Sequence, residues 1–161
     1  MVSREDFEAF LDRLAAAGAT ATEVERNLWR VRPGGALDFD VAVSYAPPVA
    51  LLRVKVMDLP DDPAAEAALG RRLLELNATD LLHGAYGFTR DAVVLTDALE
   101  LAHLDYEEFR ASYESMTLAL GAHLRDLAAL CTPDGVSVTG SHRVPAQTPA
   151  SPAPAATAEA R

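Results

Sequence analysis

The sequence has little cysteine and no long apolar run. Cys131 is the only cysteine in 161 residues, so the chain can form no internal disulfide and carries no redox pair. No apolar stretch approaches the roughly 18 residues that a membrane-spanning helix needs. The acidic start MVSREDFEAF also lacks the basic residues and apolar run of a signal peptide. We therefore expect a cytoplasmic protein with no membrane partner.

Basic residues are also scarce, and Lys55 is the only lysine. The formal net charge is -10 and the sequence pI is about 4.7. Two arginines and two acids follow Cys131, so residues 1–131 carry all of the net charge. Because so acidic a protein is repelled by phosphate backbones, we expect no nucleic-acid partner. Basic or amphipathic polypeptide segments are the more plausible partners.

Two regions of different character divide the chain. Half of all residues are hydrophobic, which is enough for one core, and we place a single domain at residues 1–131. Residues 132–161 carry five of the ten prolines and no apolar periodicity. Such a composition predicts a disordered tail, in which VSVT could at most form a brief edge strand.

Three helices are predicted within residues 1–131. The first begins at Ser3, a good N-cap, and ends at Gly18. The second begins after Asp62 with Pro63 as its first residue, and Asn77 is its expected stop. The third covers residues 104–131, where Asp105 and Glu108 have capping-box spacing. Each carries apolar residues at helical spacing, which is the pattern of a helix with one buried face.

Alternating apolar residues predict five strands. Residues 22–33 look extended, and a hairpin turn at Gly34 and Gly35 leads to 36–45 and then to 51–57. Residues 84–88 and 92–101 form a second pair. The order helix, three strands, helix, two strands, helix (α-β-β-β-α-β-β-α) indicates an α+β fold. We expect a single antiparallel sheet, covered on one face by helices.

No residue pattern in the chain makes a catalytic or metal site the leading interpretation. Gly84 and Gly87 lack the third glycine of a dinucleotide site and the lysine of a phosphate loop, so we interpret them as the joint between a helix and a strand. Two further groups of residues lack the spacing of metal ligands: the histidines with the cysteine (His83, His103, His123, His142, Cys131) and the aspartates Asp58, Asp61 and Asp62. We therefore expect no metal and no cofactor. Asp38 and Asp40, spaced to share one strand face, leave an acid/base pair open as the enzyme alternative.

The stretch from residue 73 onward resembles a known family. LLELN closing a middle helix, then GAYGF, then VVLTDALEL, then DYEEF opening a long helix is similar to the type III secretion chaperone fold, meaning the Tir-chaperone (CesT-like) family and the related YbjN-like domains. The resemblance implies a small, acidic, cytoplasmic homodimer. Such a protein binds an extended segment of a secreted client and catalyses no reaction.

The resemblance also implies two sets of site residues. Client-binding apolar patches on the first helix and the sheet map to Phe7, Phe10, Leu11, Leu14 and Trp29. A dimer contact on the middle helix maps to Leu69, Leu73 and Leu76. The alternative to a secretion chaperone is a YbjN-like regulatory or interaction domain without a secretion role. A small acid/base enzyme using Asp38 and Asp40 is a third and weaker interpretation.

Overall fold

The computed structural model describes residues 1–131, and the tail predicted for 132–161, with its VSVT segment, lies outside the described residues. Nine elements follow one another along the chain. The helices are α1 (Arg4–Ala16), α2 (Pro63–Thr79) and α3 (Tyr106–Cys131), and the strands are β1 (Thr20–Glu25), β2 (Leu28–Arg32), β3 (Val41–Ala46), β4 (Val49–Asp58), β5 (Ala85–Phe88) and β6 (Ala92–Glu100).

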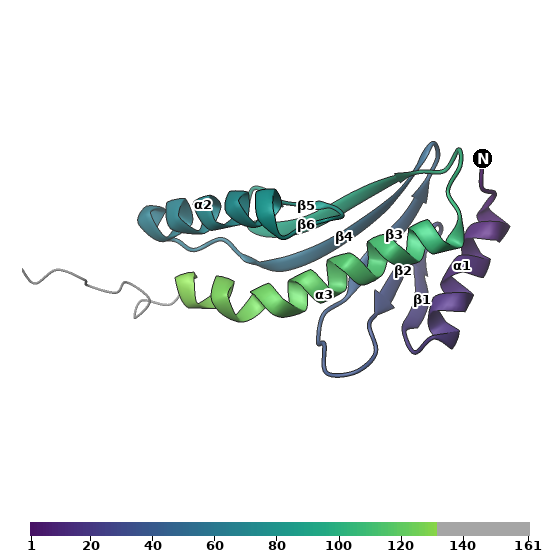
Figure 1. The fold of residues 1–161 in the computed structure, drawn as a ribbon, viewed down its shortest axis with the longest axis horizontal. Coiled ribbons are helices and arrows are strands. Elements are labelled where there is room, and N and C mark those ends of the chain that lie inside the picture. Colours follow the sequence, from purple (N-terminus) through teal and green to yellow (C-terminus); the bar gives the residue numbers. More distant parts are fainter. Residues whose placement is uncertain (132–161) are drawn as a thin grey trace, which may run out of the picture.

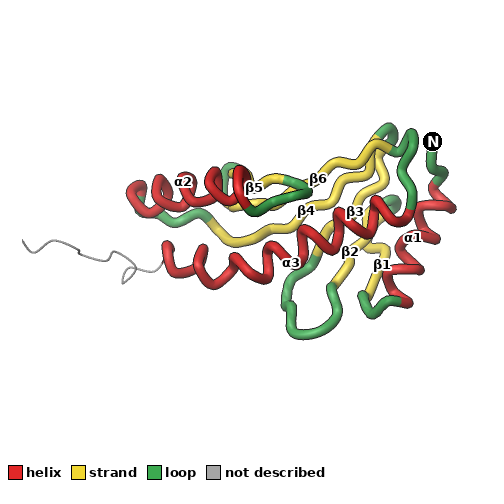
Figure 2. Tube along the Cα trace, in the orientation of Figure 1, coloured by secondary structure: helices red, strands yellow, loops and turns green. Residues whose placement is uncertain are grey.

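All six strands form one open antiparallel sheet in the order β1-β2-β3-β4-β6-β5 (Figures 1 and 2). The helices lie together on one face of it: α3 crosses the middle strands, α1 lies beside β1 and α2 beside β5 (Figure 1). The predicted α+β class, with one sheet covered on a single face, is confirmed. Strands β1 and β5 are left as the two edges of the sheet.

The predicted order is one strand short, because residues 22–33 do not form a single strand. They contribute most of β1 and all of β2, which pair as a hairpin around Arg26 and Asn27. Asn27 has a φ of 66°, a left-handed conformation that asparagine tolerates better than most residues. The observed order is therefore α-β-β-β-β-α-β-β-α. Because Arg-Asn is a weak turn signal, the imperfect alternation here was the only trace of two strands.

The predicted helix starts are confirmed by their capping contacts. The Asp6 amide donates to Ser3 Oγ over 3.1 Å, and the Ser3 amide donates to the Asp6 carboxylate over 3.2 Å. Asp62 accepts from the first amides of α2. The expected stop at Asn77 is wrong, since α2 continues to Thr79. The Asn77 side chain instead bonds both the backbone amide and carbonyl of Tyr86, which ties α2 to β5.

The glycine at the start of GAYGF serves the fold, as predicted. Gly84 has a φ of 74°, and a Cβ at this position would lie 2.7 Å from the carbonyl oxygen of Thr96. Any other residue would therefore strain the backbone and push β5 away from β6. This close approach lets the chain turn from the end of α2 directly into the edge strand.

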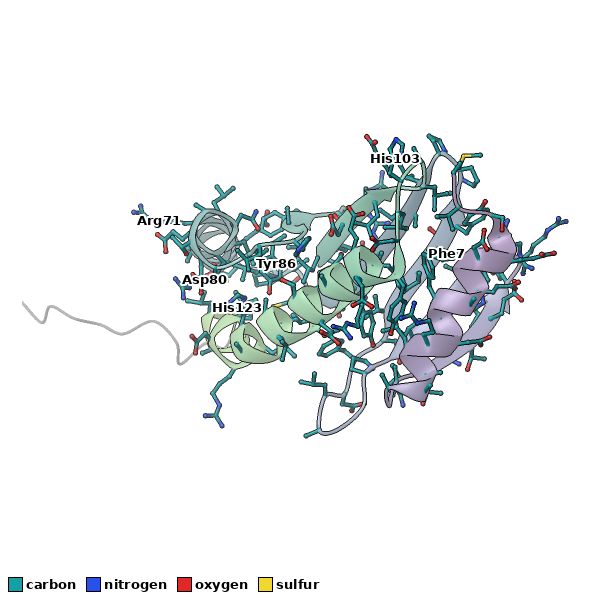
Figure 3. All side chains as sticks on the ribbon, turned by 45° about the vertical axis from the view of Figure 1, so that its right-hand side comes forward. Phe7, Arg71, Asp80, Tyr86, His103 and His123 are labelled. Atoms are coloured by element: carbon teal, nitrogen blue, oxygen red, sulfur yellow. The ribbon has the colours of Figure 1, made fainter. Side chains whose placement is uncertain are left out.

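An aromatic cluster joins α1, α3 and the sheet. The ring of Phe7, fully buried at the α1 face that looks onto the sheet, lies 5.3 Å from that of Phe109 and 5.9 Å from that of Trp29 (Figure 3). Aromatic pairs at such separations add stabilisation beyond the area they bury. The cluster therefore fixes the first helix on the sheet and is part of one continuous core.

Candidate functional site

The five residues predicted to bind a client are mostly interior. Phe7, Leu11, Leu14 and Trp29 are 5% exposed or less, and Phe10 is half-buried against the rings of Tyr106 and Phe109. The helical spacing of Phe7, Leu11 and Leu14 correctly indicated that α1 has one buried face. That face is covered by the protein's own sheet and by α3. A direct role of all five in client binding stays a prediction, and it would require α1 to move away from the sheet.

Two of the five nevertheless reach a surface groove between α1 and β1. This α1–β1 groove has a volume of about 290 Å³ and is lined by Glu8, Leu11, Asp12, Ala21, Glu23 and Trp29. Its lining is mostly polar and holds three carboxylates, and the buried side chains of Leu11 and Trp29 form a small apolar floor. Because β1 is an edge strand, half of its backbone N–H and C=O groups face away from β2. The groove thus places apolar surface, negative charge and an unpaired strand edge side by side.

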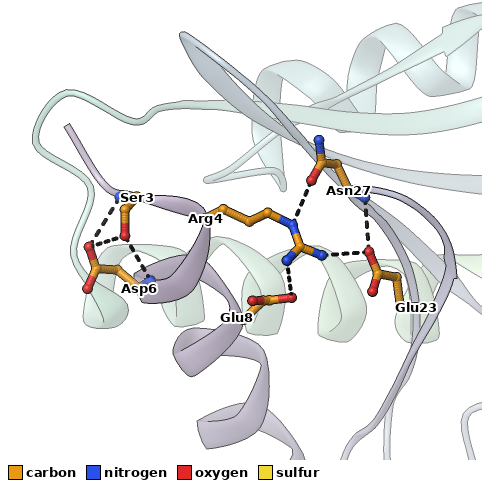
Figure 4. A network of polar contacts seen from close by, with 6 residues as sticks. All are labelled: Ser3, Arg4, Asp6, Glu8, Glu23 and Asn27. Atoms are coloured by element: carbon orange, nitrogen blue, oxygen red, sulfur yellow. Dashed lines mark hydrogen bonds and ion pairs between the residues drawn. The ribbon is translucent and has the colours of Figure 1, made fainter.

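Arg4 pairs with two of these carboxylates. Its guanidinium lies 2.8 Å from both Glu8 and Glu23 and donates to the Asn27 side chain (Figure 4). It also sits over the Trp29 ring, 5.6 Å from the ring centroid. The backbone amide of Asn27 first, and then Arg4, hold the pKa of Glu23 below its ordinary value. Glu23 therefore stays ionised at neutral pH, while Asp12 has no ion pair among the described residues.

The residues predicted for the dimer contact are also interior. Leu69, Leu73 and Leu76 are 3% exposed or less and form the stripe by which α2 packs on β5 and α3. The apolar side chains left outside are different ones: Leu74 is 70% exposed and Phe88 is 43% exposed. They flank a shallow apolar groove of about 220 Å³, the α2–β5 surface, lined by Gly70, Leu73, Leu74, Tyr86, Gly87 and Phe88. The sequence held one sign of this exposure, because Leu73 and Leu74 are adjacent in a helix and only one of them can face the core.

A polar chain lies directly behind the α2–β5 surface. The Tyr86 hydroxyl is 3.0 Å from His123 Nδ1, and His123 Nε2 is 3.4 Å from the Asp80 carboxylate (Figure 3). His123, which the sequence left without a ligand role, is buried among these partners. Burial raises the pKa of Tyr86 to about 12, so its phenol stays protonated and is a poor nucleophile. The chain links β5, α3 and the end of α2, which is a structural role.

The predicted acid/base pair is not assembled. Asp38 and Asp40 lie in the loop before β3 rather than on a strand, and Arg32 donates to both carboxylate oxygens of Asp40. The Asp40 carboxylate is thus occupied by Arg32, and the two aspartates do not share the strand face on which the acid/base pair was predicted. Within residues 1–131, no three His, Cys, Asp or Glu side chains gather closely enough to hold a metal ion. The sulfur of Cys131 packs 3.7 Å from that of Met57, and burial raises the pKa of the thiol.

Comparison with known proteins places this geometry in a family. The CesT_Tir_1 family model matches residues 4–132, which is most of the chain. The protein belongs to the CesT_Tir_1 family. The resemblance stated from the sequence is therefore confirmed, and family membership favours a chaperone that binds a polypeptide over an enzyme. No curated protein matches the sequence.

Solved structures share the fold at low sequence identity. YbjN from E. coli, a proposed transcription regulator, is 18% identical with a TM-score of 0.56, over 78% of this chain and 95% of YbjN. The ExoU–SpcU complex of the Pseudomonas aeruginosa type III secretion system contains a chain 16% identical with a TM-score of 0.55, over 74% of this chain and 95% of that one. A chain of the HopA1–SchA chaperone–effector complex is 11% identical with a TM-score of 0.51, over 74% of this chain and 93% of that one. No helix of the part that the structure describes has the length and apolar character needed to cross a membrane.

Proposed function

We propose that the protein is a non-enzymatic, cytoplasmic chaperone that holds an extended segment of a client polypeptide in the α1–β1 groove. The observation that carries the proposal is the groove itself, with Leu11 and Trp29 beside three carboxylates and the edge strand β1. Family membership supports it, as does the fold shared with a chain of a chaperone–effector complex.

Recognition in the groove follows from its chemistry. A client strand that adds to β1 gains main-chain hydrogen bonds, and these do not depend on the client's sequence. Sequence preference comes from the lining. Asp12 has no ion pair within residues 1–131 and Glu8 and Glu23 share one arginine, so the groove keeps an excess of negative charge that favours basic client side chains, and its small floor favours an apolar one. Because these carboxylates are at the surface, binding should weaken as salt is added.

The test is titration of the full chain with the segment of the client that co-purifies with it. Reversing two carboxylates at the groove, Glu8→Lys with Asp12→Lys, should weaken binding and flatten its salt dependence. The control pair Asp61→Lys with Asp126→Lys makes the same change of charge at exposed positions elsewhere. Equal affinity for the groove and control variants would refute the groove as the binding site.

We also propose a homodimer joined at the α2–β5 surface. Leu74 and Phe88 are apolar side chains left in water at an edge strand, and a second copy would cover both in an isologous contact. Leu74→Asp should lower the mass measured by light scattering to that of one chain. Leu118→Asp is the matched control, since Leu118 is also 70% exposed but lies on α3. A wild-type chain that is monomeric at tens of micromolar (about the range where a modest interface still forms) would rule the dimer out.

The second candidate is an interaction domain without a secretion role. It is favoured by the shared fold of YbjN, which covers 78% of this chain. The two candidates differ in the partner rather than in the groove. A client bound through the amino-terminal segment of a secreted protein supports the secretion chaperone, whereas a partner that stays in the cytoplasm supports the interaction domain.

A further inference from the structure

The middle of the sheet face opposite the helices carries two arginines, although residues 1–131 as a whole carry a net charge of -10. Strand register places Arg30, Ala42 and Arg53 in one row across β2, β3 and β4. The neighbouring row begins at the exposed Glu25 on β1 and runs through Leu28, Ser44 and Leu51. Trp29, Val43 and Leu52 alternate with these residues and point to the helices, so both rows lie on the uncovered face.

The two arginines of this row are free. Neither Arg30 nor Arg53 has an ion-pair partner among residues 1–131, and both are exposed. The remaining basic side chains of the face are already neutralised: Arg32 by Asp40 and Lys55 by Asp58. The middle of the open face therefore keeps two positive charges, while carboxylates gather at the α1–β1 groove on the other side.

The spacing of these arginines defines what they can hold. They lie two strands apart, which is about 9.5 Å, and only the methyl group of Ala42 stands between them. Acidic side chains seven residues apart on a helix are about 10.5 Å apart, close to the same distance. A helix laid across the strands could also rest its apolar side on the half-buried Leu28 and Leu51. Beside Arg30 there is a hollow of about 400 Å³, which leaves room for a carboxylate. It is lined by Arg30 together with Thr20, Thr22, Arg32 and Asp40.

We propose that this open face is a second docking surface, selective for an acidic amphipathic helix of a partner polypeptide. It goes beyond the proposed client groove, because it lies on the opposite face of the sheet and prefers the opposite charge. Charge complementarity and the match of spacings carry the assignment. Small residues in the rows (Ala42, Ser44) let a helix approach the sheet closely.

The experiment uses the full chain and a labelled synthetic peptide of about four helical turns, with leucines on one face and glutamates flanking them. Its counterpart carries lysine in place of each glutamate, and a single-stranded DNA oligonucleotide is the third probe. The variant is Arg30→Glu with Arg53→Glu. The control is Arg90→Glu with Arg125→Glu, which makes the same change of charge at exposed positions away from the face. Fluorescence anisotropy at low salt measures each affinity, and circular dichroism verifies the fold.

We expect the glutamate peptide to bind wild type and the control alike, and to bind the open-face variant about tenfold more weakly. The lysine peptide should instead bind the open-face variant more tightly than it binds wild type. Equal affinity of the glutamate peptide for variant and control, or no binding to wild type, would overturn the inference, as would tighter binding of the oligonucleotide at the same arginines. If the glutamate peptide fails these tests while the co-purified client still binds through the groove, only this inference fails and the proposed function stands.

Discussion

Replacing Phe7 with alanine separates a core role of the aromatic cluster from a client-binding role. The Phe7 side chain is fully buried, and its ring lies 5.9 Å from that of Trp29, 5.5 Å from that of Tyr45 and 5.3 Å from that of Phe109. Truncating a buried phenylalanine to alanine costs about 3–5 kcal/mol, because the transfer energy is lost and a cavity remains. Since domains of this size are stable by only about 5–15 kcal/mol, we expect Phe7→Ala to lose much of its folding stability.

Urea unfolding followed by fluorescence measures the loss directly. Trp29 is the only tryptophan and is 5% exposed next to Phe7, so its emission reports on this part of the core. Leu118→Ala is the control, because Leu118 is 70% exposed on α3, away from both proposed surfaces, and its truncation should cost about 1 kcal/mol or less. A Phe7→Ala chain that unfolds at the wild-type urea concentration but no longer binds client would refute the reasoning. It would mean that α1 leaves the sheet and that Phe7 contacts the client.

Three further predictions concern the elements that frame the two surfaces. Gly84→Ala should destabilise the protein by at least about 1–2 kcal/mol, because the residue has a positive φ and its Cβ would meet Thr96. The control in the same urea assay is Gly87→Ala, whose Cβ would meet nothing within 4 Å. Glu23 has a lowered pKa, so its stabilisation is present above its ordinary pKa of 4.5 and is lost as the pH falls below it; the unfolding midpoint of Glu23→Gln should therefore depend less on pH in that range, and an unchanged dependence would count against the Asn27 and Arg4 contacts. Tyr86 has a raised pKa, so stability should be full below its ordinary value of 10.0 and decline as the pH rises toward about 12; Tyr86→Phe should flatten that decline, and a variant with the wild-type alkaline profile would contradict the buried phenol.

Local features of the sequence determined the ends and types of most elements. Ser3 and Asp62 cap helices because their side chains reach amides only two or three residues away, and such contacts depend on nothing distant. Alternation over 51–57 and 92–101 predicted β4 and β6 because a half-covered strand must turn one side chain in two toward the core. The fold family was also within reach, because its pattern of apolar positions follows from the same order of elements.

Tertiary structure decided which of the predicted apolar residues remain on the surface. Periodicity marked Phe7 and Leu73 as members of apolar stripes, but it cannot say whether the chain itself or a partner covers them. Only the packing of α1 on Trp29 and of α2 on β5 buries them, and it leaves Leu74 outside.

Tertiary structure also decided which polar residues meet across the sheet. Arg30 and Arg53 are neighbours in space because β3 pairs on both sides and brings together residues far apart in the chain. Tyr86 and His123 likewise meet across 37 positions of the chain. Contacts of this kind depend on strand order and helix placement, which the whole core sets at once, so no local pattern in the sequence could encode them.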